Sequence, residues 1–114
     1  MALTAIFAQL SCSRLEESIG WFTQVFGRDP DARPMPGLAE WHEGQGAGFQ
    51  LFEAADHAGH GTLTLIVSDV ASDRARLVEA GLEPGPVEAA DYTSICRMRD
   101  PDSNLVVLAQ PTGA

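Results

Sequence analysis

The residues best suited to chemistry in this chain are its three histidines. His57 and His60 stand three residues apart with Asp56 beside them, and His42 lies earlier in the sequence. Two histidines at this spacing can ligate a metal on one face of a helix, but here glycines flank them in an expected loop and no third fixed donor accompanies them. The pattern therefore favours a solvated loop over a metal site.

The two cysteines offer no clear chemistry either. Cys12 and Cys96 lie far apart, in neither a CxxC pair nor another metal-ligand spacing, so we expect two reduced thiols in the core. The chain contains no phosphate-binding glycine loop, no GxSxG sequence and no Cys/His pair at a credible spacing. We therefore predict no catalytic residue.

Length and charge limit the class of protein. The chain has 114 residues, of which 45% are hydrophobic, which is typical of one globular domain. Seven Lys and Arg against 16 Asp and Glu give a net charge of −9, which argues against nucleic acid and membrane as partners. An acidic surface favours solubility or a cationic small ligand. The apolar stretch 3–10 lacks a basic flank and is too short to span a bilayer, so the expected compartment is the cytoplasm.

The elements that would position a site follow from hydrophobic periodicity. Residues 5–11 alternate as a half-buried strand, and Ser13 with Glu16 matches a capping box that would start a helix. Gly27 is placed to end that helix. A short edge strand is expected within 28–37, followed by a hairpin over 38–53. The apolar stripe of the helix consists of Leu15, Ile19, Phe22 and Phe26.

The second half repeats this order. A strand over 62–67 precedes a helix over 70–80, which Asp69 would cap and Gly81 would end, and strands follow at 93–99 and 104–110. The two halves are a duplicated βαβββ unit, with modules at about 4–54 and 61–111 that share one sheet within a single domain of 1–114.

Two segments resemble a known superfamily. Residues 18–27, SIGWFTQVFG, are similar to its first helix, and residues 100–104, DPDSN, are similar to its DPDGN turn. The chain thereby resembles the vicinal oxygen chelate superfamily, which includes glyoxalase I, extradiol dioxygenases, and fosfomycin- and bleomycin-resistance proteins. Ser103 replaces the usual glycine, so Ser103 or Asn104 must adopt a turn conformation that glycine adopts more easily. The resemblance implies an α+β fold, with a curled eight-stranded mixed sheet, helices outside and a site on the concave face.

In the catalytic members of that superfamily, four side chains on the concave face hold a divalent metal. Their positions correspond to Phe7, Gln50, Thr62 and Val107 here, of which only Gln50 could plausibly bind metal. We therefore expect no cofactor. Two alternatives remain: a metal-dependent lyase, isomerase or dioxygenase with an atypical ligand set, or a metal-free acid–base enzyme using Gln50, Glu53 or His42. A further alternative is a regulatory module whose cup is filled by its own side chains.

A small-molecule site is the remaining hypothesis. Strand alternation predicts an apolar cup with a few polar groups, suited to an organic ligand that is aromatic or cationic, as in antibiotic-binding bleomycin-resistance proteins. We expect a homodimer, with Trp21 off the helix stripe as an interface residue would be. Trp41 is equally compatible with the cup wall, the core or a dimer interface. The predicted ligand-binding residues are Phe7, Gln9, Trp41, Gln50, Phe52, Thr62, Thr64 and Val107.

Overall fold

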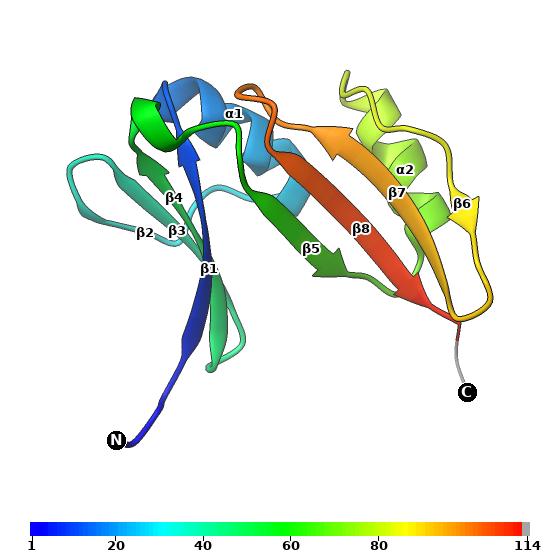
Figure 1. The fold of residues 1–114 in the computed structure, drawn as a ribbon, viewed down its shortest axis with the longest axis horizontal. Coiled ribbons are helices and arrows are strands. Elements are labelled where there is room, and N and C mark those ends of the chain that lie inside the picture. The colour runs from blue at the N-terminus through cyan, green and yellow to red at the C-terminus, as the bar shows by residue number, and fades with distance from the viewer. Residues whose placement is uncertain (113–114) are drawn as a thin grey trace.

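The chain folds into two βαβββ modules in the computed structural model, which describes residues 1–112 (Figure 1). The first module consists of β1 (Ile6–Cys12), α1 (Leu15–Phe26), β2 (Ala32–Met35), β3 (Leu38–Glu43) and β4 (Ala47–Glu53). A 3-10 turn, η1 (Ala55–His57), leads to the second module. That module consists of β5 (Thr62–Ile66), α2 (Val70–Glu79), β6 (Glu88–Ala89), β7 (Thr93–Arg99) and β8 (Leu105–Pro111).

The strands form two separate mixed sheets. Their orders are β1-β4-β3-β2 and β5-β8-β7-β6, with β1 parallel to β4 and β5 parallel to β8. The α+β fold class with duplicated βαβββ modules is confirmed, but the eight strands do not share one sheet. The strands β1 and β5 approach each other at one end, where Gly61 packs against the side chain of Leu10, and then diverge.

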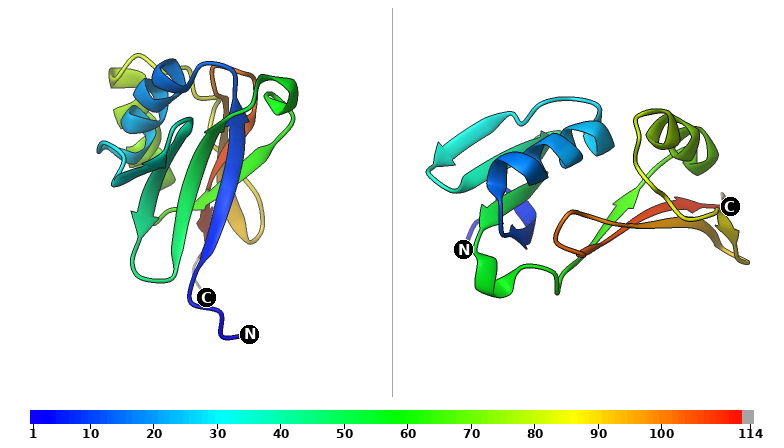
Figure 2. Two further views of the ribbon diagram at one scale, coloured as in Figure 1. Left: turned by 90° about the vertical axis from the view of Figure 1, so that its left-hand side faces the viewer. Right: turned by 90° about the horizontal axis from the view of Figure 1, so that it is seen from above.

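Both helices lie on the inner side of the angle between the sheets (Figure 2). The core forms there, where the helix-facing residues of both modules pack in one cluster, and Arg76 of α2 donates hydrogen bonds to the carbonyls of Gln24 and Val25 in α1. The helix-free faces of the two sheets point outward in different directions. A single chain therefore does not enclose the cup that the resemblance implies.

The start of α1 differs from the prediction, and the capping box is wrong. Arg14 precedes the helix in an extended conformation without a side-chain cap. The Ser13 hydroxyl instead donates a hydrogen bond to Asp102, and the Leu15 N–H donates one to Glu53 Oε1 at 3.0 Å. Carboxylates that are distant in sequence have taken the place of the local cap. The predicted end of α1 is confirmed, because Gly27 is left-handed with φ 73°.

The predicted start of α2 is also confirmed, since the Asp69 side chain accepts a hydrogen bond from the Ser72 N–H at 3.1 Å. None of the helices within residues 1–112 has the length and apolar character needed to cross a bilayer.

The 100–104 turn joins the two modules. Asn104 is buried, and its amide donates hydrogen bonds to the Ser11 carbonyl in β1 at 3.0 Å and to Asp100 Oδ2 at 2.8 Å. Its Oδ1 accepts from the N–H group of Gly61 at 2.9 Å. Ser103 has φ 73° and thus takes the left-handed conformation that the sequence required at this turn. The turn therefore fixes β1 relative to the second module.

Candidate ligand-binding site

Burial confirms part of the strand alternation predicted from the sequence. Leu10, Leu51, Leu63 and Leu108 are buried on the helix side of their sheets, whereas Ala8, on the same side of β1 as Leu10, is exposed. The predicted site residues on the helix-free face of the first sheet are Phe7, Gln9, Gln50 and Phe52. Those on the helix-free face of the second sheet are Thr62, Thr64 and Val107.

Trp41 is the exception, and its expected place on the cup wall is wrong. The side chain is 0% exposed and stacks on Phe26 of α1, with ring centroids 5.3 Å apart. Its Nε1–H donates to the Arg28 carbonyl at 3.0 Å, which satisfies the indole within the core. Trp41 alternates with Glu40 and His42 along β3. Its side chain therefore points toward the helix, while those of Glu40 and His42 point away from it.

A row of polar side chains crosses the helix-free face of the first sheet. Gln9 Nε2 donates to Gln50 Oε1 at 3.0 Å, and Gln50 Nε2 donates to Glu40 Oε2 at 2.7 Å. His42 Nε2 lies 2.9 Å from Glu40 Oε1. The four side chains come from three neighbouring strands, because Gln9 and Glu40 each lie opposite Gln50 in the sheet register. We call Gln9, Gln50, Glu40 and His42 the polar row.

Glu40 was not among the predicted binding residues, because the hairpin pattern alone did not fix the register that places it. The hairpin over 38–53 pairs residues around its turn, and this register puts Glu40 opposite Gln50. Gln50 is not an isolated amide. Its oxygen and nitrogen both have partners in the structure, so it is one link of a chain of hydrogen bonds.

The row holds a fixed negative charge. The side chain of Glu40 is only 14% exposed, and the hydrogen bond with His42, followed by that from Gln50, lowers the pKa of its carboxyl group. The ring of Phe7 meets His42 edge to face, with centroids 5.7 Å apart, and Phe52 borders the row on β4. An aromatic surface thus lies beside a carboxylate that can accept hydrogen bonds or pair with a cation.

The residues at the superfamily's metal-ligand positions do not fit a metal. The side chains of Phe7 and Val107 have no lone pair, and the Gln50 oxygen already accepts a hydrogen bond from Gln9. Those positions are also divided between two outward-facing sheets. A metal site needs a cluster of at least three His, Cys, Asp or Glu side chains, and residues 1–112 contain no such cluster. His57 and His60 are exposed at the linker between the modules.

Comparison with known proteins agrees with this architecture. A scan against protein-family models and a search of curated proteins found no match. Among solved structures, a glyoxalase/bleomycin resistance protein from Catenulispora acidiphila DSM 44928 has a TM-score of 0.85 and 25% identity, over 93% of this chain and 96% of that one. The chain shares the fold of the glyoxalase/bleomycin-resistance proteins. This result is consistent with the vicinal oxygen chelate superfamily that the sequence resembles.

Two further neighbours with this fold are described as binding proteins. An antibiotic binding protein from Streptomyces sp. CB03234 has a TM-score of 0.83 and 23% identity, over 98% of this chain and 99% of that one. A bleomycin-binding protein, solved in complex with bleomycin, has a TM-score of 0.77 and 15% identity, over 92% of this chain and 96% of that one.

Proposed function

We propose that this protein binds a small organic molecule, without a metal ion, on the helix-free faces of its sheets. The observation that carries the proposal is the polar row beside Phe7 and Phe52, which combines aromatic surface with groups that can orient a ligand. Pockets for organic ligands have this composition, in which a few placed polar groups lie among apolar ones. The antibiotic-binding neighbours with the same fold support the proposal.

The chemistry of the row favours a ligand with an aromatic part and a basic or hydrogen-donating group. The Glu40 carboxylate would receive that group, while ring stacking on Phe7 would contribute roughly 0.5–1.5 kcal/mol. Thr62, Thr64 and Val107 would supply the facing wall. A protein of this kind would act by sequestering its ligand, for example an antibiotic, rather than by transforming it.

The facing wall would come from a second copy of the chain. Phe7 is 36% exposed and Ile66 is 68% exposed, which leaves an apolar residue open on each helix-free face. A homodimer that sets the first sheet of one chain against the second sheet of its partner would cover both faces and complete two equivalent cups. We place this dimer in the cytoplasm, where Cys12 and Cys96, both buried and free, would stay reduced. Burial also raises the pKa of Cys12 to about 11, so it would be an unreactive thiol.

The test is a thermal-shift screen of antibiotics and aromatic metabolites, repeated with a chelator, with affinities of the hits measured by calorimetry. A ligand at 100 times its Kd stabilises the native state by roughly 2.7 kcal/mol, which is readily detected. We expect the screen to find ligands whose affinity does not change when the chelator is added. The Phe7→Ala variant should bind these ligands more weakly. Arg33→Gln is the matched control, since Arg33 pairs with Glu16 away from the row. Binding that disappears with the chelator would favour the metal-dependent alternative.

A further inference from the structure

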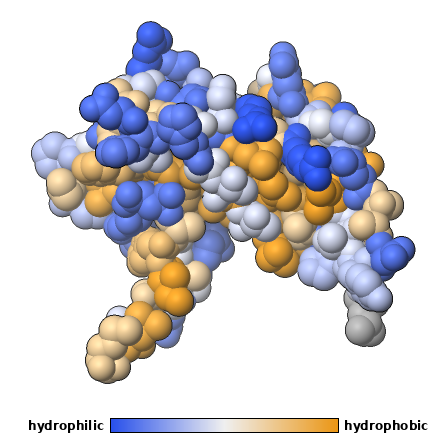
Figure 3. Space-filling view, in the orientation of Figure 1, coloured by the Kyte–Doolittle hydropathy of each residue, from blue (hydrophilic) through white to orange (hydrophobic). Residues whose placement is uncertain are grey.

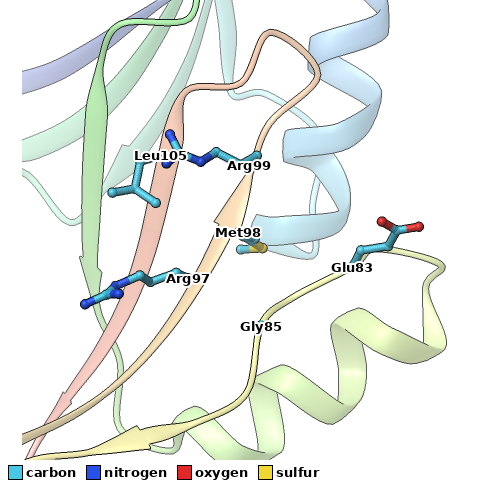
Figure 4. A pocket seen from close by; sticks show the side chains of 6 residues that line it. All are labelled: Glu83, Gly85, Arg97, Met98, Arg99 and Leu105. Atoms are coloured by element: carbon cyan, nitrogen blue, oxygen red, sulfur yellow. The ribbon is translucent and has the colours of Figure 1, made fainter.

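Two arginines lie on the helix-free face of the second sheet. Arg97 and Arg99 are two residues apart in β7, where they pair across the sheet with Val107 and Leu105. Figure 4 shows both side chains directed across β8 toward β5. On the same face, apolar groups of β8 are exposed with hydrophilic groups lying among them (Figure 3). Two positive charges therefore lie beside exposed apolar groups in a chain whose net charge is −9.

These arginines keep more free donors than Arg28 and Arg33. Arg33 makes two hydrogen bonds to Glu16, at 2.8 and 3.1 Å, and Arg28 is bonded to both Asp31 and Glu43. Arg97, by contrast, has a carboxylate oxygen of Glu88 at 3.6 Å, which is an ion pair longer than a hydrogen bond.

Arg99 donates one hydrogen bond, to the Ser103 carbonyl at 3.1 Å. Within residues 1–112 it takes part in no ion pair. A guanidinium group has five N–H donors, so most of those on Arg97 and Arg99 face solvent.

A recess adjoins the pair. It has a volume of about 400 Å3 and lies between the end of β7 and the segment that precedes β6. Its lining residues are Glu83, Gly85, Arg97, Met98, Arg99 and Leu105. The segment is held in place because Gly85 N–H donates to the Arg97 carbonyl at 2.7 Å and Arg74 donates to the Gly85 carbonyl at 2.7 Å. The hollow has one acidic residue at its edge, and the guanidinium groups of Arg97 and Arg99 extend away from it over β8 (Figure 4).

We propose that Arg97 and Arg99 form an oxyanion subsite, which takes a carboxylate or phosphate group of the bound molecule. The planar guanidinium group matches the geometry of such anions through paired N–H donors. This inference rests on the proposed function, because the arginines would bind the acidic group of the same ligand whose basic group Glu40 receives. In the proposed dimer, the polar row of one chain supplies a carboxylate to the cup, and the arginines on the second sheet of the other chain supply cations. The ligand is therefore a dipolar aromatic molecule with a basic and an acidic group.

The subsite can be tested with simple anions, without knowledge of the ligand. The seven Lys and Arg residues of the chain are all arginines. Their Nε–Hε signals in a nitrogen–proton correlation spectrum therefore report on every one of these side chains that could bind the added anion. Inorganic phosphate and acetate are added separately at constant ionic strength. We expect saturable shifts of Arg97 and Arg99 at millimolar anion, while Arg33 shifts little. Shifts at Arg97 and Arg99 no larger than that of Arg33 would overturn the inference.

Two variants should change the anion affinity in opposite directions. Arg99→Gln should weaken the binding at least fivefold, whereas Glu88→Gln should strengthen it several-fold because the carboxylate competing for Arg97 is removed. Arg33→Gln should leave it unchanged, and circular dichroism checks that each variant folds. If Glu88→Gln weakens the binding, Arg97 acts only as a structural partner of Glu88 and the subsite is refuted. The anion titration is independent of the organic-ligand screen, so either proposal can fail alone.

Discussion

Glu40 and Arg97 occupy equivalent positions in the two modules and carry opposite charges. Glu40 lies opposite Gln50 on the neighbouring strand, and Arg97 lies opposite Val107. Gln50 and Val107 in turn correspond to one metal-ligand position in each module of the superfamily that the sequence resembles. The two helix-free faces therefore share a backbone register but differ in chemistry. A ligand between two such faces would be oriented by charge, a role that a central metal would otherwise fill.

Gln50 should stabilise the fold through the polar row. Replacing it by leucine removes its hydrogen bond to Glu40, whose carboxylate is 14% exposed. We expect Gln50→Leu to lower the free energy of unfolding by about 1–3 kcal/mol. Gln9→Leu is the matched control, since it leaves the bond between Gln50 and Glu40 in place and should cost less. Urea titrations of both variants would measure the difference, and equal losses would contradict the role given to Glu40.

Glu40 should make stability depend on acid pH. Its pKa in the folded state is lowered from 4.5, mainly by the hydrogen bond with His42. Because the pKa of Glu40 is lower in the folded state than in the unfolded state, the ionised carboxylate stabilises the fold. This stabilisation is complete above pH 4.5 and is lost as the pH falls through the folded pKa. Urea midpoints between pH 7 and 3 should fall less steeply for Glu40→Gln than for the parent chain. Glu79→Gln, which removes an exposed carboxylate on α2, should keep the parental slope.

The parts of this structure that follow from short sequence patterns were predictable. The strand β1 and the end of α1 at Gly27 depend on residues a few positions apart. The capping box at Ser13 failed because Asp102, far away in the sequence, takes the Ser13 hydroxyl. Trp41 was ambiguous because alternation alone does not say which face of the hairpin meets a helix. The split into two sheets depends on how β1 and β5 diverge, which no local pattern records.

The polar row was predictable only in part. An amide at position 50 that faces an apolar cup needs a hydrogen-bond partner, and Gln9 is such a partner. The place of Glu40 depended on the hairpin register, and that of Arg97 on the register between β7 and β8. A single residue of slip reverses the face of every side chain in a strand, so these assignments needed the structure.

Ser103 should be a site at which glycine increases stability. Its φ of 73° places a residue with a Cβ in the left-handed region, where non-glycine residues are strained by roughly 1–2 kcal/mol. Glycine also adds freedom to the unfolded chain, so the net gain from Ser103→Gly should be about 0.5–1 kcal/mol. Calorimetry should show a Tm higher by a few degrees. Ser13→Gly is the control, and it should lower stability because the Ser13 hydroxyl is bonded to Asp102.

The proposed dimer should depend on one residue from each helix-free face. Phe7→Asp and Ile66→Asp would each place a charge where an apolar side chain is covered by the partner, and we expect either change to weaken the dimer at least tenfold in sedimentation experiments. Val78→Asp is the control, because Val78 is 49% exposed on α2, away from both faces. A parent chain that sediments as a stable 12.2 kDa monomer at micromolar concentration would refute the dimer.

Mixing the two variants distinguishes the proposed arrangement from other dimers. If the first sheet of one chain meets the second sheet of the other, the Ile66→Asp chain still offers an intact first sheet and the Phe7→Asp chain an intact second sheet. One of the two interfaces in the mixed dimer is then free of substitution, so the mixture should associate more tightly than either variant alone. A dimer that sets like faces together has no such combination and would show no rescue. Absence of rescue would therefore contradict a cup shared between the two sheets of different chains.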